Sequence, residues 1–268
     1  MEPSAPDELV NNGARMGRIV AVANQKGGVG KTTTAINLAA GLAALDRKVL
    51  IVDADPQANA TSGLGEARKD NGINTYGVLL GEPAATAIRS TAFPNLSLLP
   101  SVRDLVGAEI ELVEQPDREG RLREALGPVR PVFDDVFLDC PPSLSLLTVN
   151  ALTAADAVLV PIQTEYFALE GLSELLETVE RVRDSFNPLL ELDGIVLTMF
   201  DDRTNLGRQV SEDIRKHFGD RVYRTVIPRN IRLGEAPSFG KPVLAYDIKS
   251  KGAEAYLALA REYLRRQG

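Results

Sequence analysis

The chain has 268 residues and a formal net charge of −7, and its 44% hydrophobic and 25% charged residues are typical of a folded globular protein, which argues against extensive disorder. No apolar run reaches the roughly 18 residues of a membrane span, and the polar N-terminus lacks the apolar core of a signal peptide, which predicts a cytoplasmic protein. A single cysteine, Cys140, and a single histidine, His217, argue against an internal disulfide and a Cys- or His-based metal cluster.

Residues 1–17 mix proline, asparagine, glycine and acids without periodicity, which predicts a flexible tail ahead of one domain over 18–268. From Arg18 onward, short apolar runs alternate with helical patterns. The runs lie at 19–22, 49–52, 136–138, 157–160 and 195–197, and the clearest helical patterns at 31–45, 168–186 and 252–266. Runs that are apolar throughout are typical of strands covered on both faces, and helices between them imply right-handed crossovers. The sequence therefore predicts an α/β fold with a doubly wound, mostly parallel sheet. The boundaries of helices and strands are least defined in residues 62–130, which are rich in glycine, proline and short helical stretches.

A glycine-rich stretch, NQKGGVGKTTT at 24–34, lies between the first predicted strand and the first predicted helix. It nearly matches the phosphate-loop template G-x-x-x-x-G-K-[ST], but Gln25 replaces the first glycine and Lys26 follows it. Its glycines let successive N–H groups and the helix N-terminus surround an anion, while Lys31 is predicted to neutralise terminal phosphates and Thr32 to bind Mg²⁺. A glycine turn with incidental lysines is the alternative. The residues assigned to the nucleotide are Lys26, Gly27, Gly28, Val29, Gly30, Lys31, Thr32 and Thr33.

Two later apolar runs end in acidic residues. Asp53-Ala54-Asp55 follows the run 49–52, and Asp139 follows the run 136–138. Open α/β sheets bind ligands at the carboxyl edge of their strands, so these carboxylates are expected beside the phosphate loop. If the strand continues, alternation puts Asp53 and Asp55 on one side, where one supports the water shell of a metal and the other orients an attacking water. Asp139 is placed to hold Mg²⁺ through water, with helix capping as the alternative for each acid taken alone.

Six stretches of the chain together resemble the ParA/Soj family of chromosome and plasmid partition ATPases, within the deviant Walker A class. They are KGGVGKTTT, DADPQANATSGLG, DCPPS, PIQTEYFALEGL, LTMFDDRTNLG and IPRNIRLGEAPSFGKPV. The resemblance runs from about Arg18 to the C-terminus and keeps the order and approximate spacing of the family. It implies a P-loop NTPase fold and an ATPase that uses ATP and Mg²⁺, with weak intrinsic activity stimulated by a partner.

The resemblance also implies roles for single residues. Lys26 is similar to the signature lysine, which reaches across a dimer interface to the nucleotide of the other subunit, where a positive charge stabilises the transition state as an arginine finger does. A solvated loop position, or a phosphate contact within its own subunit, is the alternative for Lys26. Asp55 resembles the water-activating acid, and Asp53 the acid that supports the metal. The predicted catalytic set is Lys26, Asp55 and Lys31, and the predicted metal set is Thr32, Asp53 and Asp139.

The adenine site is expected near the C-terminal third of the chain. Pro228 and Asn230, in IPRN, match the family segment that packs on adenine, and Met199 ends a strand near the same base. A plain turn is the alternative for Pro228. Residues 165–171 resemble the switch region that follows the nucleotide state, although an ordinary strand-to-helix connection has similar features.

Charge is distributed unevenly along the chain. Residues 201–268 hold 14 Lys/Arg and 9 Asp/Glu, a local charge of +5, whereas residues 1–200 carry −12. A dimer doubles any basic patch, and counterion release makes affinity for double-stranded DNA grow with the number of phosphate contacts. No recognition helix is evident, because the segment 204–218 lacks a second helix, so DNA binding is expected to be independent of sequence. The DNA-binding candidates are Arg203, Arg224, Arg232, Lys249 and Lys251, of which Arg203 and Arg232 match DNA-contacting arginines of Soj-like members, and a solvated surface cation is the alternative for each.

The leading hypothesis is an ATP-dependent partition switch. ATP-bound homodimers coat the nucleoid, and a ParB-like centromere-binding protein stimulates hydrolysis and releases them. A MinD-like protein that positions the division site is the alternative, but the C-terminal AYLALAREYLRRQG fits a terminal helix docked on the fold, so no membrane partner is expected. A metabolic ligase of the same superfamily, which requires a second-substrate pocket, stays open. A redox relative requires paired cluster cysteines, which Cys140 cannot supply.

Overall fold

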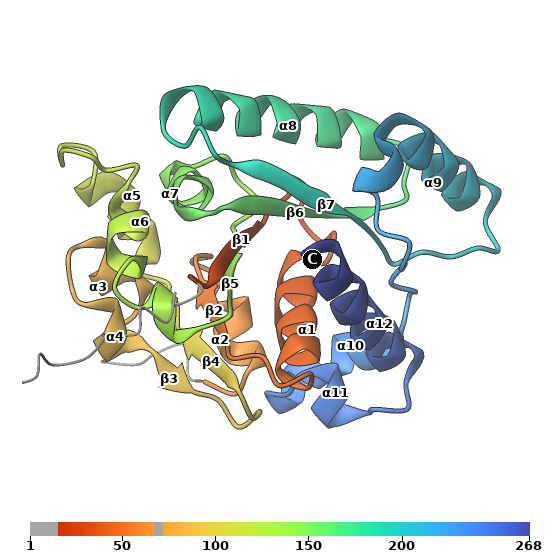
Figure 1. Cartoon of the computed structure of the whole chain (residues 1–268), viewed down its shortest axis with the longest axis horizontal. Coiled ribbons are helices and arrows are strands. Elements are labelled where there is room, and N and C mark those ends of the chain that lie inside the picture. Colours follow the sequence, from red (N-terminus) through yellow and green to blue (C-terminus); the bar gives the residue numbers. More distant parts are fainter. Residues whose placement is uncertain (1–15, 67–71) are drawn as a thin grey trace, which may run out of the picture.

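The computed structural model describes residues 16–66 and 72–268, and the centre of this part is a seven-stranded sheet (Figure 1). The strand order is β3-β4-β2-β5-β1-β6-β7, and every neighbouring pair is parallel except β3 with β4. The strands are β1 (Arg18–Val22), β2 (Val49–Asp53), β3 (Arg89–Ser90), β4 (Leu96–Leu99), β5 (Asp135–Asp139), β6 (Ala157–Gln163) and β7 (Glu191–Thr198). The predicted doubly wound, mostly parallel sheet is confirmed.

Helices cover both faces of the sheet (Figure 1). One face packs against α3 (Thr75–Leu79), α4 (Ala84–Ala87), α5 (Leu105–Glu111), α6 (Arg121–Leu126), α7 (Leu146–Ala154), α8 (Ala168–Ser185) and α9 (Asn205–Phe218). The other face packs against α1 (Lys31–Ala43), α2 (Asn59–Gly63), α10 (Ile231–Glu235), α11 (Val243–Tyr246) and α12 (Lys251–Arg266). Three short 3₁₀ segments complete the described elements: η1 (Arg130–Val132), η2 (Gly219–Arg221) and η3 (Ala236–Phe239).

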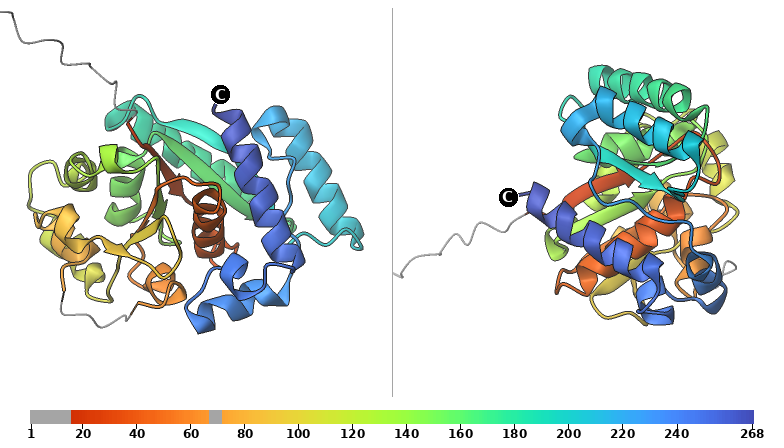
Figure 2. Two further views of the ribbon diagram at one scale, coloured as in Figure 1. Left: turned by 60° about the horizontal axis from the view of Figure 1, so that its bottom comes forward. Right: turned by 90° about the vertical axis from the view of Figure 1, so that its right-hand side faces the viewer.

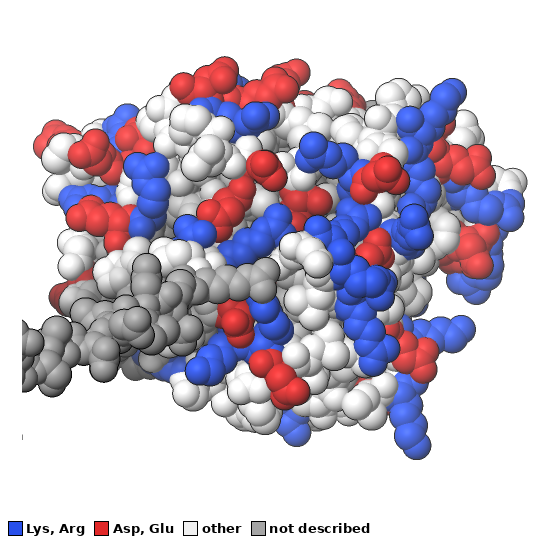
Figure 3. All heavy atoms as spheres, viewed as in Figure 1, with Lys and Arg blue, Asp and Glu red and all other residues white. Residues whose placement is uncertain are grey.

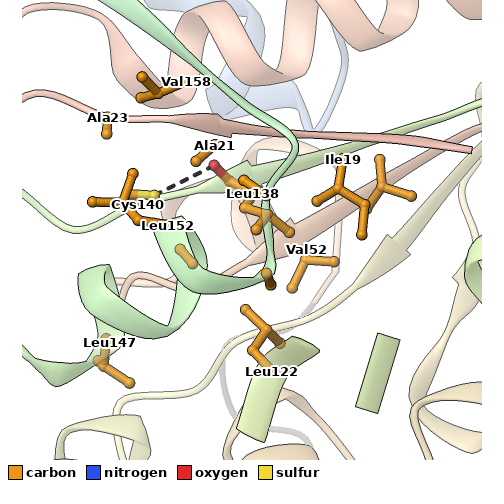
Figure 4. Close-up of a cluster of buried hydrophobic side chains, with 14 of the residues drawn as sticks. Ile19, Ala21, Ala23, Val52, Leu122, Leu138, Cys140, Leu147, Leu152 and Val158 are labelled. Atoms are coloured by element: carbon orange, nitrogen blue, oxygen red, sulfur yellow. Dashed lines mark hydrogen bonds between the residues drawn. The ribbon is translucent and has the colours of Figure 1, made fainter. Parts of the chain in front are cut away.

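Alternation along each central strand explains why the apolar runs lack polar positions. In β1, Ile19 and Ala21 join the first hydrophobic cluster, whereas Val20 and Val22 join the second on the opposite face. Both faces are covered by helices, so neither set can be polar without burying an unpaired group. Figure 4 shows part of the first cluster, in which the buried Cys140 thiol contacts the carbonyl oxygen of Leu138 at 3.6 Å.

The C-terminal helix α12 packs along α1, as the side and bottom views in Figure 2 show. Its apolar side is buried through Tyr256, Leu259 and Tyr263, and a Cβ on Gly41 of α1 would lie only 2.9 Å from the Ala260 side chain. Fully burying a side chain such as Leu259 contributes about 1.5–3 kcal/mol, so exposing this face would cost several kcal/mol in total. The prediction of a docked terminal helix is confirmed. Across the described residues, no helix has both the length and the apolarity needed to cross a membrane.

Part of the fold was not predicted. Strands β3 and β4, which extend the sheet beyond β2, lie in the region 62–130, where element boundaries could not be predicted. Helix α9 is followed by the short η2 and not by a second helix, which agrees with the rejection of a helix-turn-helix at 204–218. The expected tail, 1–17, falls mostly outside the described residues, and the division into tail and domain stays a prediction.

Two glycines bring α2 and η3 into backbone contact. Gly65 and Gly240 both have positive φ, at 90° and 63°. A Cβ on Gly240 would lie 2.6 Å from the Cα of Gly65, closer than any real side chain can approach. The segment after α2 and the segment after η3 can therefore touch only because neither residue carries a side chain.

Candidate nucleotide and metal site

The carboxyl edge of the sheet collects the predicted site residues because three adjacent strands end together. In the register of the sheet, Asp139 of β5 pairs with Val22 of β1 on one side and with Asp53 of β2 on the other. The phosphate loop leaves β1 directly after Val22 and leads into α1. The two acids therefore lie at the base of the loop, where parallel α/β sheets bind their ligands.

The phosphate loop has the backbone geometry of an anion cradle. Gly28 and Gly30 adopt φ values of 76° and 90°, a region that residues with a side chain rarely enter. Helix α1 begins at Lys31 with Gly30 as its cap and no side chain bonded to its first turn, so its N-terminal N–H groups stay available to an anion. The buried Asn24 braces the loop, because its amide donates to the Pro161 carbonyl at 2.8 Å and its oxygen accepts the Lys26 N–H at 2.9 Å.

The two lysines of the loop are placed differently. Lys31 is only 7% exposed, and its ammonium donates to the carbonyl oxygen of Lys26 at 3.0 Å. Burial lowers the pKa of Lys31, while Asp139, Cys140 and Asp55 oppose that effect. The Lys26 side chain is 43% exposed and its ammonium pairs at 2.5 Å with Glu165, which follows β6. Lys31 therefore points into the cradle, whereas Lys26 lies on its outer surface.

Asp139 is a buried carboxylate without a hydrogen-bond partner in the described part of the chain. It is 0% exposed, and neither carboxylate oxygen has a hydrogen-bond partner among the described residues. Burial raises its pKa well above the ordinary value, and Asp53 and Asp55 add to that effect, whereas Thr32 and Lys31 oppose it. An orphaned pair of buried carboxylate oxygens next to the Thr32 hydroxyl fits a Mg²⁺ site, because hard cations prefer oxygen ligands and supply the missing positive charge.

Asp53 is fully satisfied by the protein, unlike Asp139. One of its oxygens accepts both the N–H and the hydroxyl of Thr61 at 2.7 Å, and the other accepts the Asp55 N–H at 3.2 Å. Burial raises its pKa to about 6, while the Thr61 and Asp55 contacts oppose the shift. Its oxygens have less capacity left for a metal than those of Asp139, which fits support of the metal's water shell.

Asp55 lies beyond the end of β2, so the alternation expected for a continuing strand does not apply to it. It is 6% exposed, and its Oδ1 accepts the Gln57 N–H at 2.8 Å. Its backbone carbonyl accepts the Ser101 hydroxyl at 2.8 Å, so the loop after β4 holds it in position. The second carboxylate oxygen has no bond of this kind in the described residues, which leaves it able to accept a proton or orient a water.

The residues expected near adenine come together beside the loop. Thr198, the last residue of β7, donates its hydroxyl to the Val29 carbonyl at 2.7 Å, which fixes the end of β7 against the phosphate loop. Met199 follows with φ 48°, and Phe200 forms a bridge with Pro228. Asn230 caps α10 by accepting the Arg232 N–H at 3.0 Å. The structure thus brings Met199, Pro228 and Asn230 to one corner, and contact with a base stays a prediction.

A cavity of about 520 Å³ opens on another side of α1. It lies between the first turns of α1, helix α2 and the η3 segment. The residues that line it include Thr32, Thr33, Ser62 and Lys241, but not the three expected adenine residues. This cavity is adjacent to the phosphate loop, because Thr32 and Thr33 at the start of α1 line it.

The DNA-binding candidates do not form one patch. Arg232, Lys249 and Lys251 lie in the corner where α10, α11 and α12 meet. Arg232 pairs with Glu235 at 2.7 Å and with Asp247 at 3.2 Å, whereas the two lysines have no ion pair within the described parts of the chain.

Arg203 and Arg224 differ from that group. Arg203 is 83% exposed and makes a two-pronged contact with Asp201, whose pKa falls to about 2 through this hydrogen bonding. The Arg224 N–H donates to Glu262, roughly 16 Å further along α12 than Lys251. Figure 3 shows blue side chains concentrated over α12, with red ones among them.

Sequence reasoning missed the supporting residues. Asn24, Thr61 and Thr198 hold the loop or Asp53 in place, and Glu165, placed in a switch region, was not assigned a partner. A buried polar residue next to a motif is the signal that could have identified the first three, because buried polar groups are nearly always hydrogen-bonded.

Comparisons with known proteins identify similar chains. A family model described as an AAA domain matches residues 17–192. The chain is 56% identical over 253 residues to the chromosome partitioning protein ParA of Caulobacter vibrioides, covering 93% of this chain and 95% of that one. It is 54% identical to the chromosome-partitioning ATPase Soj of Thermus thermophilus, with 93% and 96% covered. A solved structure of cobyrinic acid a,c-diamide synthase from Mycobacterium smegmatis with bound ADP and magnesium is similar at a TM-score of 0.83 and 40% identity, covering 94% and 96%.

Proposed function

The chain belongs to the ParA/Soj family of chromosome partitioning ATPases, and we propose that it is an ATP-dependent DNA partitioning switch. The family resemblance and the nucleotide-bound structural neighbour support ATPase activity with ATP and Mg²⁺ as cofactors. In the proposed cycle, an ATP-bound homodimer binds double-stranded DNA without sequence preference, which associates it with the nucleoid. A ParB-like protein then stimulates a weak intrinsic hydrolysis and releases the dimer.

The observation that carries this proposal is the different placement of the two loop lysines. Lys31 is buried with its ammonium inside its own cradle, whereas Lys26 is exposed on the outer surface of the same loop. A solvated outer lysine cannot serve the phosphates of its own loop without moving, but it can reach a nucleotide presented by a second subunit. A positive charge delivered there stabilises the charge that develops on the terminal phosphate. Because the phosphate is then shared, ATP favours the dimer and hydrolysis weakens it.

The remaining site residues have complementary tasks in this proposal. Lys31 and the loop N–H groups bind the phosphates, while Thr32 and Asp139 hold Mg²⁺ and Asp53 supports its water shell. The metal supplies charge neutralisation at the phosphate oxygens. Asp55 orients the attacking water, because one of its carboxylate oxygens accepts the Gln57 N–H and the other has no such bond among residues 16–66 and 72–268. Met199, Pro228 and Asn230 hold adenine.

DNA binding is proposed for the corner of α10, α11 and α12, together with Arg203. Lys249 and Lys251 have no ion pair there within the described residues, so they can contact DNA phosphates without breaking one of the described pairs. To contact DNA phosphates, Arg203 and Arg232 must share their guanidinium groups with their carboxylate partners or release those partners. Arg224 lies further along α12 and is the weakest candidate of the five.

The test measures dimerisation and binding to random-sequence DNA with ATP and with ADP. Lys26→Ala is expected to lose ATP-driven dimerisation, Asp55→Ala to accumulate a DNA-bound dimer, and Lys249→Glu/Lys251→Glu to dimerise without retaining DNA. Arg232→Glu is expected to lose DNA as well, but it also breaks the ion pairs to Glu235 and Asp247, so Arg232→Lys is its matched control. Equal DNA affinity in ATP and ADP contradicts the switch.

An ATP-dependent ligase is a second candidate, favoured by the name of the solved neighbour and by the cavity beside Thr32 and Thr33. The higher identity to partitioning proteins, 56% against 40%, favours the switch. Hydrolysis of ATP stimulated by DNA and a ParB-like protein, in the absence of any carboxylic acid or amide donor, separates the two.

A further inference from the structure

The ion pair between Lys26 and Glu165 lies within one subunit, yet the proposed function requires Lys26 to act on the other. Both side chains are half exposed, at 43% and 45%, and their charged atoms approach to 2.5 Å. We infer that Glu165 is a positioning residue that holds Lys26 in its own subunit and competes with the partner's nucleotide for it. This inference rests on the proposed function and adds a residue to its control.

The ion pair between Lys26 and Glu165 has a well-defined geometry, because hydrogen bonds anchor the backbone of both residues. The Lys26 N–H donates to the Asn24 oxygen at 2.9 Å, and Asn24 is itself fixed to Pro161. Glu165 stands between β6 and α8, where its N–H donates to the Gln163 carbonyl at 2.8 Å and its carbonyl accepts the Ala168 N–H at 3.0 Å. Anchored backbones reduce the number of arrangements that the two side chains lose on pairing, so this contact is better defined than a pair between two mobile loops.

The charges make the competition exclusive. A lysine ammonium is a compact charge, and a triphosphate attracts it more strongly than a single carboxylate does. When Lys26 moves to a phosphate, the Glu165 carboxylate loses its counter-ion at a surface that now faces an anion. The residues that follow, Tyr166 and Phe167, are 76% and 63% exposed and lie edge to face with ring centroids 5.0 Å apart.

The experiment is a double-mutant cycle on dimerisation, measured by sedimentation with a non-hydrolysable ATP analogue and Mg²⁺. The variants are Lys26→Ala, Glu165→Gln and the double variant. An exposed ion pair changes an equilibrium by about 1.5- to 5-fold, and a dimer releases two of them, so Glu165→Gln is expected to tighten the dimer by about 2- to 25-fold. Lys26→Ala is expected to be monomeric under these conditions, and Glu165→Gln is expected not to restore its dimerisation.

Two controls separate this role from a general charge effect. Glu170→Gln removes an exposed acid from the first turn of α8 that has no ion pair within the described residues, and it is expected to leave dimerisation unchanged. The Glu165→Gln effect is expected to shrink between about 0.1 M and 1 M salt, because salt screens exposed charges. The inference is overturned if Glu165→Gln weakens the dimer or leaves it unchanged, or if it restores dimerisation to Lys26→Ala. If Lys26→Ala itself leaves ATP-driven dimerisation intact, the proposed function fails instead.

Discussion

Replacing Asp139 by asparagine is expected to stabilise the chain in the absence of nucleotide and metal, although the residue belongs to the candidate site. Both carboxylate oxygens are buried and have no hydrogen-bond partner in the part of the chain that the structure describes, and Asp139 lies next to Asp53 in the sheet register. A buried polar group without a partner costs about 1–3 kcal/mol, and more when it is charged. Asparagine has nearly the same shape and no charge, so the substitution is expected to raise the free energy of unfolding by about 1–2 kcal/mol. For a chain of this size, each kcal/mol corresponds to an increase of roughly 2–4 °C in Tm.

Asp53→Asn is the matched control, because Asp53 has the same burial but three hydrogen bonds. An amide can keep only part of this set, so we expect a loss of about 1–3 kcal/mol. Thermal unfolding with and without Mg²⁺-ATP is the assay, and the magnesium-dependent stabilisation of the wild type is expected to disappear in Asp139→Asn. If Asp139→Asn destabilises the chain as much as Asp53→Asn does, the reasoning about the orphaned carboxylate is refuted.

Three further predictions follow from other contacts. Gly240→Ala is expected to lose about 1–3 kcal/mol of stability in urea denaturation, since its positive φ and its approach to Gly65 both exclude a Cβ. The matched control is Gly234→Ala in helix α10, whose Cβ would meet no atom within 4 Å and which is expected to keep or slightly raise stability. Glu262 is nearly buried, which disfavours its charge, but the Thr225 and Arg224 N–H groups and Arg266 outweigh burial and lower its pKa. Because the folded-state pKa is lowered, the ionised Glu262 stabilises the fold at pH values above its ordinary pKa of 4.5, and this stability is lost as pH falls through the folded-state pKa. Glu262→Gln is therefore expected to reduce the loss of unfolding free energy at acidic pH. An unchanged acid dependence of the unfolding free energy contradicts this. Lys31→Ala is expected to weaken ATP binding by about 2–5 kcal/mol in a fluorescent-nucleotide titration, and retained affinity would place the phosphates elsewhere.

The parts of the fold that could be predicted are those whose pattern reflects burial. The strands around the site are apolar at their central positions because helices cover both faces of the sheet, so their sequence alone identifies them. Strand β4 is only Leu96–Leu99 in a region of glycine, proline and short helices, and β3 is two residues long, so neither has a pattern that distinguishes it from a loop.

The site follows the same division. Lys31, Asp53 and Asp139 could be placed because their positions follow from strand ends and loop spacing. Contacts between distant segments could not be predicted, because the hydrogen bond of Thr198 to Val29 and the ion pair of Glu165 with Lys26 form only after the chain has folded. Pairing among surface charges is likewise a property of the folded chain, which is why the carboxylate partners of Arg232 were not anticipated.

The packing of α12 on α1 has a consequence for biosynthesis. Helix α1 leaves the ribosome early, at residues 31–43, but the helix that shields its outer side is translated only at residues 251–266. Throughout this interval the nascent polypeptide must carry an uncovered alanine- and leucine-rich surface directly attached to the nucleotide loop. Chaperones that recognise exposed apolar segments therefore have a defined target until translation finishes, and a truncated product that lacks the last turns would keep that target permanently.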